Sequence, residues 1–113
     1  MTNFAINVES FKRVDLVTVA GRVDSSNASE LDTVLQSLLN NNRHNIVLDL
    51  GQVSYMSSAG LRAVVSALRE SKKNGGDLRL ASPSERVTEV LELSGLNSLF
   101  EKFDDLTHAV GSF

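Results

Sequence analysis

The sequence predicts an α/β fold: a mixed β-sheet of about four to five strands with about four helices mainly on one face. Short apolar runs rich in Val, Ile and Leu alternate along the chain with segments of helical periodicity. One run, at 46–50, is interrupted only by Asp49, as expected of a strand buried on both faces of a parallel sheet. Parallel neighbours need crossover connections, and the helical segments supply them.

The chain opens with a predicted β-hairpin. Phe4, Ile6 and Val8 alternate with polar or small residues, and a second apolar stretch follows at 14–19. The segment 21–24 (Gly-Arg-Val-Asp) closes the second strand. Polar residues on both strands indicate one less buried edge of the sheet.

A helix follows this hairpin. Asp24, Ser25 or Ser26 can cap its first turn, because their side-chain oxygens accept hydrogen bonds from free backbone N–H groups. The three asparagines at 40–42 mark its end. Its buried stripe consists of Ala28, Leu31, Leu35 and Leu38 or Leu39.

The central strand and the second helix occupy the stretch 45–74. The apolar run at 46–50 leads through Ser57 and Ser58 into helical periodicity, and glycines at 75–76 end the helix. The apolar face of this helix consists of Leu61, Val64, Val65 and Leu68.

The C-terminal third repeats the alternation. A short strand at 78–81 precedes a helix in which Pro83 suits the first turn and which ends at 94–95. The segment 96–103 indicates a packed turn and a last strand, and Asp104 can cap a final short helix. The apolar residues of the two helices are Val87, Val90, Leu91, Leu106, Ala109 and Val110.

The composition predicts a single domain, 1–113, because 113 residues can bury a core of their own. There is no cysteine, which excludes disulfides and thiolate chemistry. The N-terminal residues 1–4 lack the basic start and long apolar stretch of a secretory signal. No segment reaches transmembrane length, so we expect a cytoplasmic protein without membrane insertion.

The charge pattern argues against direct nucleic-acid binding. The net charge is −3 with acidic and basic residues interspersed, so no basic stripe is available for a phosphate backbone. The chain has five phenylalanines, one tyrosine and no tryptophan, which is a poor basis for stacking bases.

No group of residues predicts catalysis, a metal site or a cofactor. His44 and His108 are isolated, and a metal site needs clustered ligands. Ser58 lacks the preceding glycine of a nucleophile elbow. The glycines at 75–76 are not followed by the Gly-Lys-Ser or Gly-Lys-Thr of a phosphate-binding loop.

Ser57 and Ser58 have two interpretations from spacing alone. A serine at a helix start caps free N–H groups, which is a purely structural role. The same N–H groups and the positive end of the helix dipole would also accommodate a phosphoryl group on one of the two hydroxyls.

Four short motifs together resemble the anti-anti-sigma factors, which are small bacterial STAS-domain proteins. These are Gly-Arg-Val-Asp at 21–24, His-Asn-Ile-Val-Leu-Asp-Leu at 44–50, Val-Ser-Tyr-Met-Ser-Ser-Ala-Gly-Leu at 53–61, and Leu-Ser-Gly-Leu at 93–96. They follow the family's order and spacing over nearly the whole chain.

The resemblance implies a STAS-like sheet with helices on one side and a regulatory switch rather than an enzyme. In this family the unphosphorylated antagonist binds an anti-sigma factor that has a histidine-kinase-like ATP-binding fold, which frees a sigma factor. The same anti-sigma factor acts as a serine kinase that phosphorylates and releases the antagonist, and a metal-dependent serine phosphatase resets it.

The resemblance makes Ser58 the expected phosphorylation site. The family pattern is Asp-Ser-Ser-Gly-Leu with the first serine modified, and the corresponding segment here is 57–61. Ser57 replaces the aspartate and Ala59 replaces the second serine, so Ser57 is an alternative acceptor. Asp24 matches the family's acidic residue after the second strand, where a role as helix cap and a role at the binding surface both stay open.

Partner contacts are expected from the loop after the second strand, from the serine segment and from the outward side of the second helix. An equally open reading makes these ordinary solvent-facing positions. The alternative function is a STAS subunit of another signalling scaffold or of a lipid-transport assembly; the oligomeric state and nucleotide binding are undetermined. The expected contact residues are Asp24, Ser57, Ser58, Ala59, Arg62, Ala63, Ser66 and Arg69.

Overall fold

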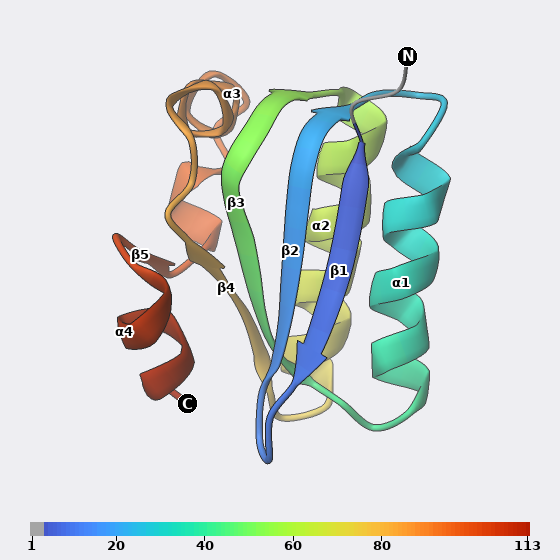
Figure 1. Cartoon of the computed structure of the whole chain (residues 1–113), viewed down its shortest axis with the longest axis vertical. Helices are drawn as coiled ribbons and strands as arrows, with labels where there is room; N and C mark the ends of the chain where they lie inside the picture. The colour runs from blue at the N-terminus through green and yellow to red at the C-terminus, as the bar shows by residue number, and fades with distance from the viewer. Residues whose placement is uncertain (1–3) are drawn as a thin grey trace.

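One five-stranded sheet, in the order β1-β2-β3-β4-β5, organises the chain (Figure 1). The computed structural model describes residues 4–113, so most of the N-terminal segment inspected for a secretory signal lies outside the described residues. The elements are β1 (Ala5–Ser10), β2 (Asp15–Val23), α1 (Ala28–Asn40), β3 (Asn45–Met56), α2 (Ser58–Lys73), β4 (Asp77–Ala81), α3 (Glu85–Leu93), the 3-10 turn η1 (Asn97–Leu99), β5 (Lys102–Phe103) and α4 (Leu106–Gly111).

The strand directions confirm the predicted mixed sheet. β1 pairs antiparallel with β2, which is the expected hairpin. β2, β3, β4 and β5 pair parallel with one another through the helical crossovers. The hairpin and the parallel crossovers both follow the predicted order of strands and helices.

The helices lie mainly on one face of the sheet, as predicted. α1, α2 and α3 contribute to the larger apolar core together with strand residues such as Ile46 and Leu48. Val47, between them, belongs to a smaller cluster with Leu16 and with Ala109 of α4 on the opposite face. The run at 46–50 is thus buried on both faces, and α4 alone of the four helices covers the second one (Figure 1).

β3 is longer than the sequence pattern indicated, running to Met56 rather than ending near Leu50. Beyond Asp49 it pairs only with β2, because its pairing with β4 stops there. With one neighbour fewer, this half buries Val53 and Met56 but leaves Gln52 exposed. A half-exposed strand carries no continuous apolar run, which is why the pattern missed it.

The predicted cap of α1 was wrong by a few residues. The N-cap is Asn27, and its side chain makes no capping hydrogen bond. The backbone carbonyl of Asp24 instead accepts the N–H of Ala28 at 2.9 Å, so a turn precedes the helix. The hydrogen-bonding side chain at 24 shapes that turn rather than capping the helix.

Two further caps differ from the sequence prediction. Pro83 precedes the N-cap of α3 rather than lying in its first turn; the cap is Ser84, whose hydroxyl accepts the N–H of Val87. α4 is capped by Asp105 rather than Asp104. Neighbouring residues of similar chemistry make the exact cap position hard to predict.

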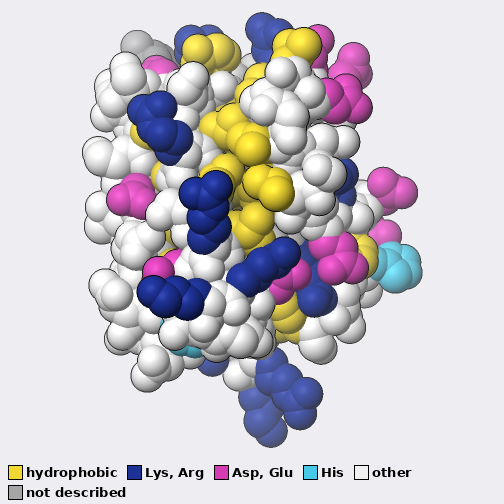
Figure 2. Space-filling view, turned by 180° about the vertical axis from the view of Figure 1, so that it is seen from behind, with side chains coloured by type: hydrophobic (Ala, Val, Ile, Leu, Met, Phe, Trp, Pro, Cys, Tyr) yellow, Lys and Arg dark blue, Asp and Glu magenta, His cyan; other side chains and the backbone are white. Residues whose placement is uncertain are grey.

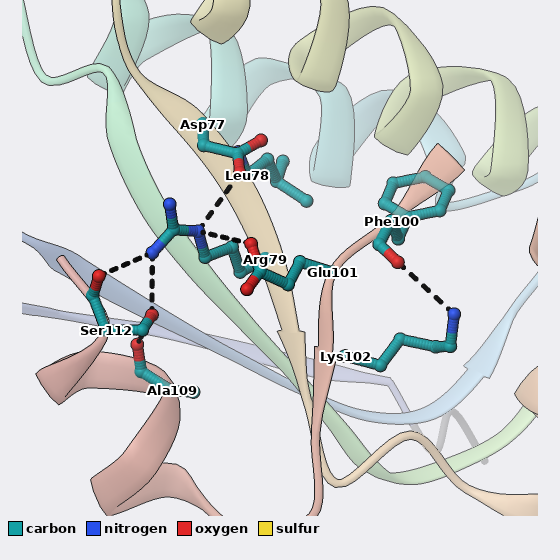
Figure 3. Close-up of polar contacts among 8 residues, drawn as sticks. All are labelled: Asp77, Leu78, Arg79, Phe100, Glu101, Lys102, Ala109 and Ser112. Carbon is teal, nitrogen blue, oxygen red and sulfur yellow. Dashed lines mark hydrogen bonds and ion pairs between the residues drawn. The ribbon is translucent and has the colours of Figure 1, made fainter. Parts of the chain in front are cut away.

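Arg79 of β4 connects the sheet to the C-terminal end of α4 through hydrogen bonds (Figure 3). Its Nη1 donates to the backbone oxygen of Ser112 at 2.7 Å and to the hydroxyl at 2.8 Å. Its Nε lies 3.0 Å from Asp77 and 3.5 Å from Glu101. The guanidinium also lies over the ring of Phe113, 4.0 Å from the ring centre.

Candidate functional site

Ser57 is the N-cap of α2. Its hydroxyl oxygen accepts a hydrogen bond from the backbone N–H of Gly60 at 3.1 Å. Its own N–H donates to the backbone oxygen of Val23 at 2.8 Å, which ties the helix start to the end of β2. The hydroxyl of Ser57 is therefore engaged in the fold, as expected of a capping serine.

Ser58 is in a different situation, although it is adjacent in sequence. It is the first residue of α2 and its side chain is exposed. Among residues 4–113, no hydrogen-bond partner is found for its hydroxyl. The first-turn N–H groups and the positive end of the helix dipole surround this position. Ser58 thus presents a free nucleophilic oxygen where added negative charge is tolerated.

Gly60 allows the start of α2 to lie tightly against the ends of β2 and β3. A Cβ at this position would come within 2.6 Å of both Val23 Cγ1 and Met56 Sδ. Any other residue would push the helix away from the strands, since those contacts are far below van der Waals distance. The glycine therefore fixes where Ser58 is held.

Asp24 lies at the same end of the sheet as the two serines. Val23 and Met56 are register partners in β2 and β3, and Asp24 and Ser57 are the residues that follow them. The Asp24 carboxylate accepts the N–H of Ser26 at 2.9 Å and its hydroxyl at 2.5 Å. These hydrogen bonds, the hydroxyl first, lower the pKa of Asp24 and keep the side chain ionised.

The outward side of α2 exposes most of the other predicted contact residues. Arg62, Ser66 and Arg69 are all exposed, and Ala59 is half-buried. Ala63 was wrongly expected to face outward. It is 7% exposed because it lies on the side of α2 that packs in the core next to α1.

A groove of about 630 Å³ runs along α2 from Ser58 towards the end of the helix; we call it the α2 groove. Figure 2, which views the molecule from behind, shows hydrophobic side chains in a stripe down the middle of this face, with Lys and Arg side chains beside it. The residues that line the groove are Ser58, Leu61, Arg62, Val65, Ser66, Arg69, Glu70, Lys73 and Leu96.

Leu96 and Lys73 line the groove but are not among the contact residues expected from the sequence. Leu96 follows α3 and reaches the groove only because the chain folds back beside α2, and no local pattern reports this proximity. Lys73 recurs at helical spacing from Arg62, Ser66 and Arg69, so the periodicity of α2 could have included it.

Neither histidine belongs to a cluster of possible metal ligands in the part of the chain that the structure describes. Within residues 4–113, no group of three or more His, Asp or Glu side chains is arranged to hold a metal ion. His108 is exposed and its Nδ1 lies 2.6 Å from Asp105 Oδ2.

None of the helices in the described part of the chain, residues 4–113, has the length and apolarity needed to cross a membrane.

Comparisons with known proteins converge on one family. The STAS domain profile matches residues 5–109. A Bordetella bronchiseptica protein assigned as the anti-sigma factor antagonist BtrV is 34% identical over 98 residues, which cover 87% of this chain and 84% of BtrV. The anti-sigma-B factor antagonist of Staphylococcus epidermidis is 31% identical over 96 residues, which cover 83% of this chain and 89% of that protein.

Comparison with solved structures points to the same family as these relatives. The crystal structure of a Thermotoga maritima protein assigned as an anti-sigma factor antagonist superposes with a TM-score of 0.87 at 25% identity. The superposition covers 95% of this chain and 92% of the other one. The sheet and its helical layer are therefore shared over nearly the full length.

Proposed function

This chain belongs to the STAS domain family, and from that premise we propose that it is an anti-sigma factor antagonist controlled by phosphorylation of Ser58. In its unmodified form it binds an anti-sigma factor that has serine kinase activity, which frees a sigma factor. Phosphorylation by that kinase releases the antagonist. The names of its relatives support the class of partner.

One observation carries the choice of residue. The two adjacent serines differ in their hydrogen bonding. The hydroxyl of Ser57 accepts the capping hydrogen bond from Gly60, whereas the hydroxyl of Ser58 is exposed and has no hydrogen-bond partner within the described chain. A kinase can reach Ser58 without breaking the cap of α2. The Ser57 oxygen would have to leave its hydrogen bond with the Gly60 N–H before it could attack a phosphoryl group.

The proposed chemistry needs no catalytic group from this chain. The Ser58 oxygen attacks the γ-phosphorus of ATP held by the kinase, ADP leaves, and the hydroxyl proton passes to a base of the kinase. A serine phosphatase later hydrolyses the ester with water, which restores Ser58 and produces inorganic phosphate. The protein is accordingly a substrate and a binding partner, and the proposed place of action is the cytoplasm.

Phosphorylation would weaken binding through charge. The phosphate adds close to two negative charges at pH 7, at the same end of the sheet as the ionised Asp24. A partner surface that fits the unmodified site would meet repulsion and a larger desolvation cost. The phosphate would also meet the N-terminus of α2, so the free domain keeps its fold.

The test combines partner capture with phosphopeptide mapping of residues 55–62. We expect the wild-type protein to capture an anti-sigma factor with a kinase fold, and the phosphate to map to Ser58. Ser58→Ala should retain binding and accept no phosphate, and Ser58→Asp should bind more weakly. Phosphate on the Ser58→Ala protein would move the acceptor to Ser57, and stable capture of membrane-transport subunits instead would contradict the proposal.

A further inference from the structure

The α2 groove combines an apolar floor with a cationic rim. Leu61, Val65 and Leu96 form the floor. Arg62, Arg69 and Lys73 contribute three positive charges to the lining, against the single negative charge of Glu70. The groove follows a helix of 16 residues, which is about 24 Å long.

The cations of this groove have no acidic partner within residues 4–113, whereas three arginines elsewhere in the chain do. Arg43 pairs with Asp15, Arg79 with Asp77, and Arg86 with Glu89. No such ion pair forms at Arg62, Arg69 or Lys73, whose side chains are on exposed residues. Their charges are therefore available to an anionic partner.

We propose that the α2 groove binds an acidic amphipathic helix of the partner protein and that phosphate on Ser58 closes the groove by pairing with Arg62. This inference rests on the proposed function, because it describes how the same partner is held and released. The apolar side of such a helix would cover the floor residues. Carboxylates along its edges would meet the rim cations, so charge complementarity selects an acidic sequence.

The position of Ser58 at one end of this groove links binding to modification. Arg62 follows Ser58 by four positions on α2, so the two side chains are neighbours on the helix surface. A phosphate there can accept paired hydrogen bonds from the guanidinium. The modification then adds negative charge and removes one cation from the rim, and both effects disfavour an acidic helix.

The binding test uses charge reversals on one helix and the purified anti-sigma factor encoded in the same genome. We expect Arg69→Glu and Lys73→Glu each to weaken binding about tenfold by calorimetry at low salt, with the loss shrinking as salt rises. Lys72→Glu is the matched control, because Lys72 is exposed on α2 but does not line the groove. It should change affinity less than twofold.

Two outcomes would contradict binding in the α2 groove while leaving the antagonist function intact. One is equal weakening by Lys72→Glu and Lys73→Glu, and the other is unchanged binding by all three variants. Failure of the proposed function looks different, because the wild-type protein would then bind no anti-sigma factor. Sedimentation of the free protein provides a further check. If Arg69→Glu dissociates a wild-type dimer, the occupant of the groove is a second copy of this chain and the proposal is wrong.

The phosphate pairing is tested without a partner, on protein carrying phosphoserine at position 58. The second ionisation of phosphoserine is normally near pH 6, and an adjacent guanidinium lowers that pKa. By ³¹P NMR titration we expect Arg62→Gln to raise the phosphate pKa, whereas Arg69→Gln, nearly two turns further along α2, leaves it unchanged. An identical titration midpoint in wild type and Arg62→Gln would rule out the pairing.

Discussion

The guanidinium of Arg43 binds the buried carboxylate of Asp15, with Arg43 Nε 2.6 Å from Asp15 Oδ2. The Asp15 side chain is 0% exposed and the Arg43 side chain 31% exposed. Arg43 Nη2 also donates to the backbone oxygen of Phe11 at 2.6 Å. The hydrogen bond to Asp15 raises the pKa of Arg43. Together, the contacts with Asp15 and Phe11 join the β1–β2 turn to the segment before β3.

Removing Arg43 alone should be costly, because it leaves a buried carboxylate without its partner. We expect Arg43→Met to lower the free energy of unfolding by about 3 kcal/mol, measured by urea denaturation. The double variant Asp15→Val with Arg43→Met should recover much of that loss, since no buried charge remains. A double variant as unstable as the sum of both single variants would show that the pair acts independently of its charge.

The Asp15–Arg43 pair also marks a limit of prediction from the sequence. The two residues are 28 positions apart, and neither position carries a local pattern that reports the contact. The order of strands and helices could be predicted because apolar periodicity is local. The bounds of β3 and the caps of α1 and α4 could not be predicted in this way, because they depend on which neighbours each segment meets in the fold.

At the candidate site, too, some features could be predicted from the sequence and others could not. The helix start at Ser57 and Ser58 could be predicted from the change of periodicity, which is a local signal. The different environments of the two hydroxyls could not be predicted from the sequence. Which serine caps the helix depends on where the backbone N–H of Gly60 points, and this N–H donates to Ser57. Ala63 was misplaced because alanine fits an exposed or a buried helix position equally well.

The two serines should differ in stability as well as in modification. Ser57→Ala should lower the free energy of unfolding by about 1 kcal/mol, because the N–H of Gly60 loses its acceptor. Ser58→Ala should change it by less than about 0.5 kcal/mol, since an exposed side chain without a partner contributes little. Thermal unfolding of both variants checks this, and a larger cost at Ser58 would mean that its hydroxyl supports the fold.

Gly60→Ala should destabilise the protein by about 1 to 3 kcal/mol, because the new Cβ would overlap Val23 Cγ1 and Met56 Sδ. The valine is stiff, so the start of α2 must move. We also expect amide chemical-shift changes at Ser57 and Ser58 in ¹⁵N NMR spectra.

Gly111→Ala is the control for this substitution. Gly111 lies in α4, and an added Cβ would meet no heavy atom within 4 Å beyond its chain neighbours and the backbone of its own helix. It should leave stability unchanged or slightly higher, since alanine favours a helix more than glycine does. Comparable losses in both variants would indicate that backbone freedom rather than the close approach at Gly60 sets the cost.

Ser26→Ala should raise the pKa of Asp24. The Ser26 hydroxyl donates the hydrogen bond that contributes most to lowering this pKa below its ordinary value of 3.8, and the Ser26 N–H, which contributes next, survives the substitution. A carboxylate with a lowered pKa in the folded state stabilises the fold above the unfolded value, and this stabilisation is lost as the pH falls through the folded pKa. The variant should therefore lose less stability than wild type on acidification below pH 3.8. A ¹³C NMR titration of the Asp24 carboxyl group measures the shift directly, and an unchanged midpoint in Ser26→Ala would assign the lowered pKa to the backbone N–H groups instead.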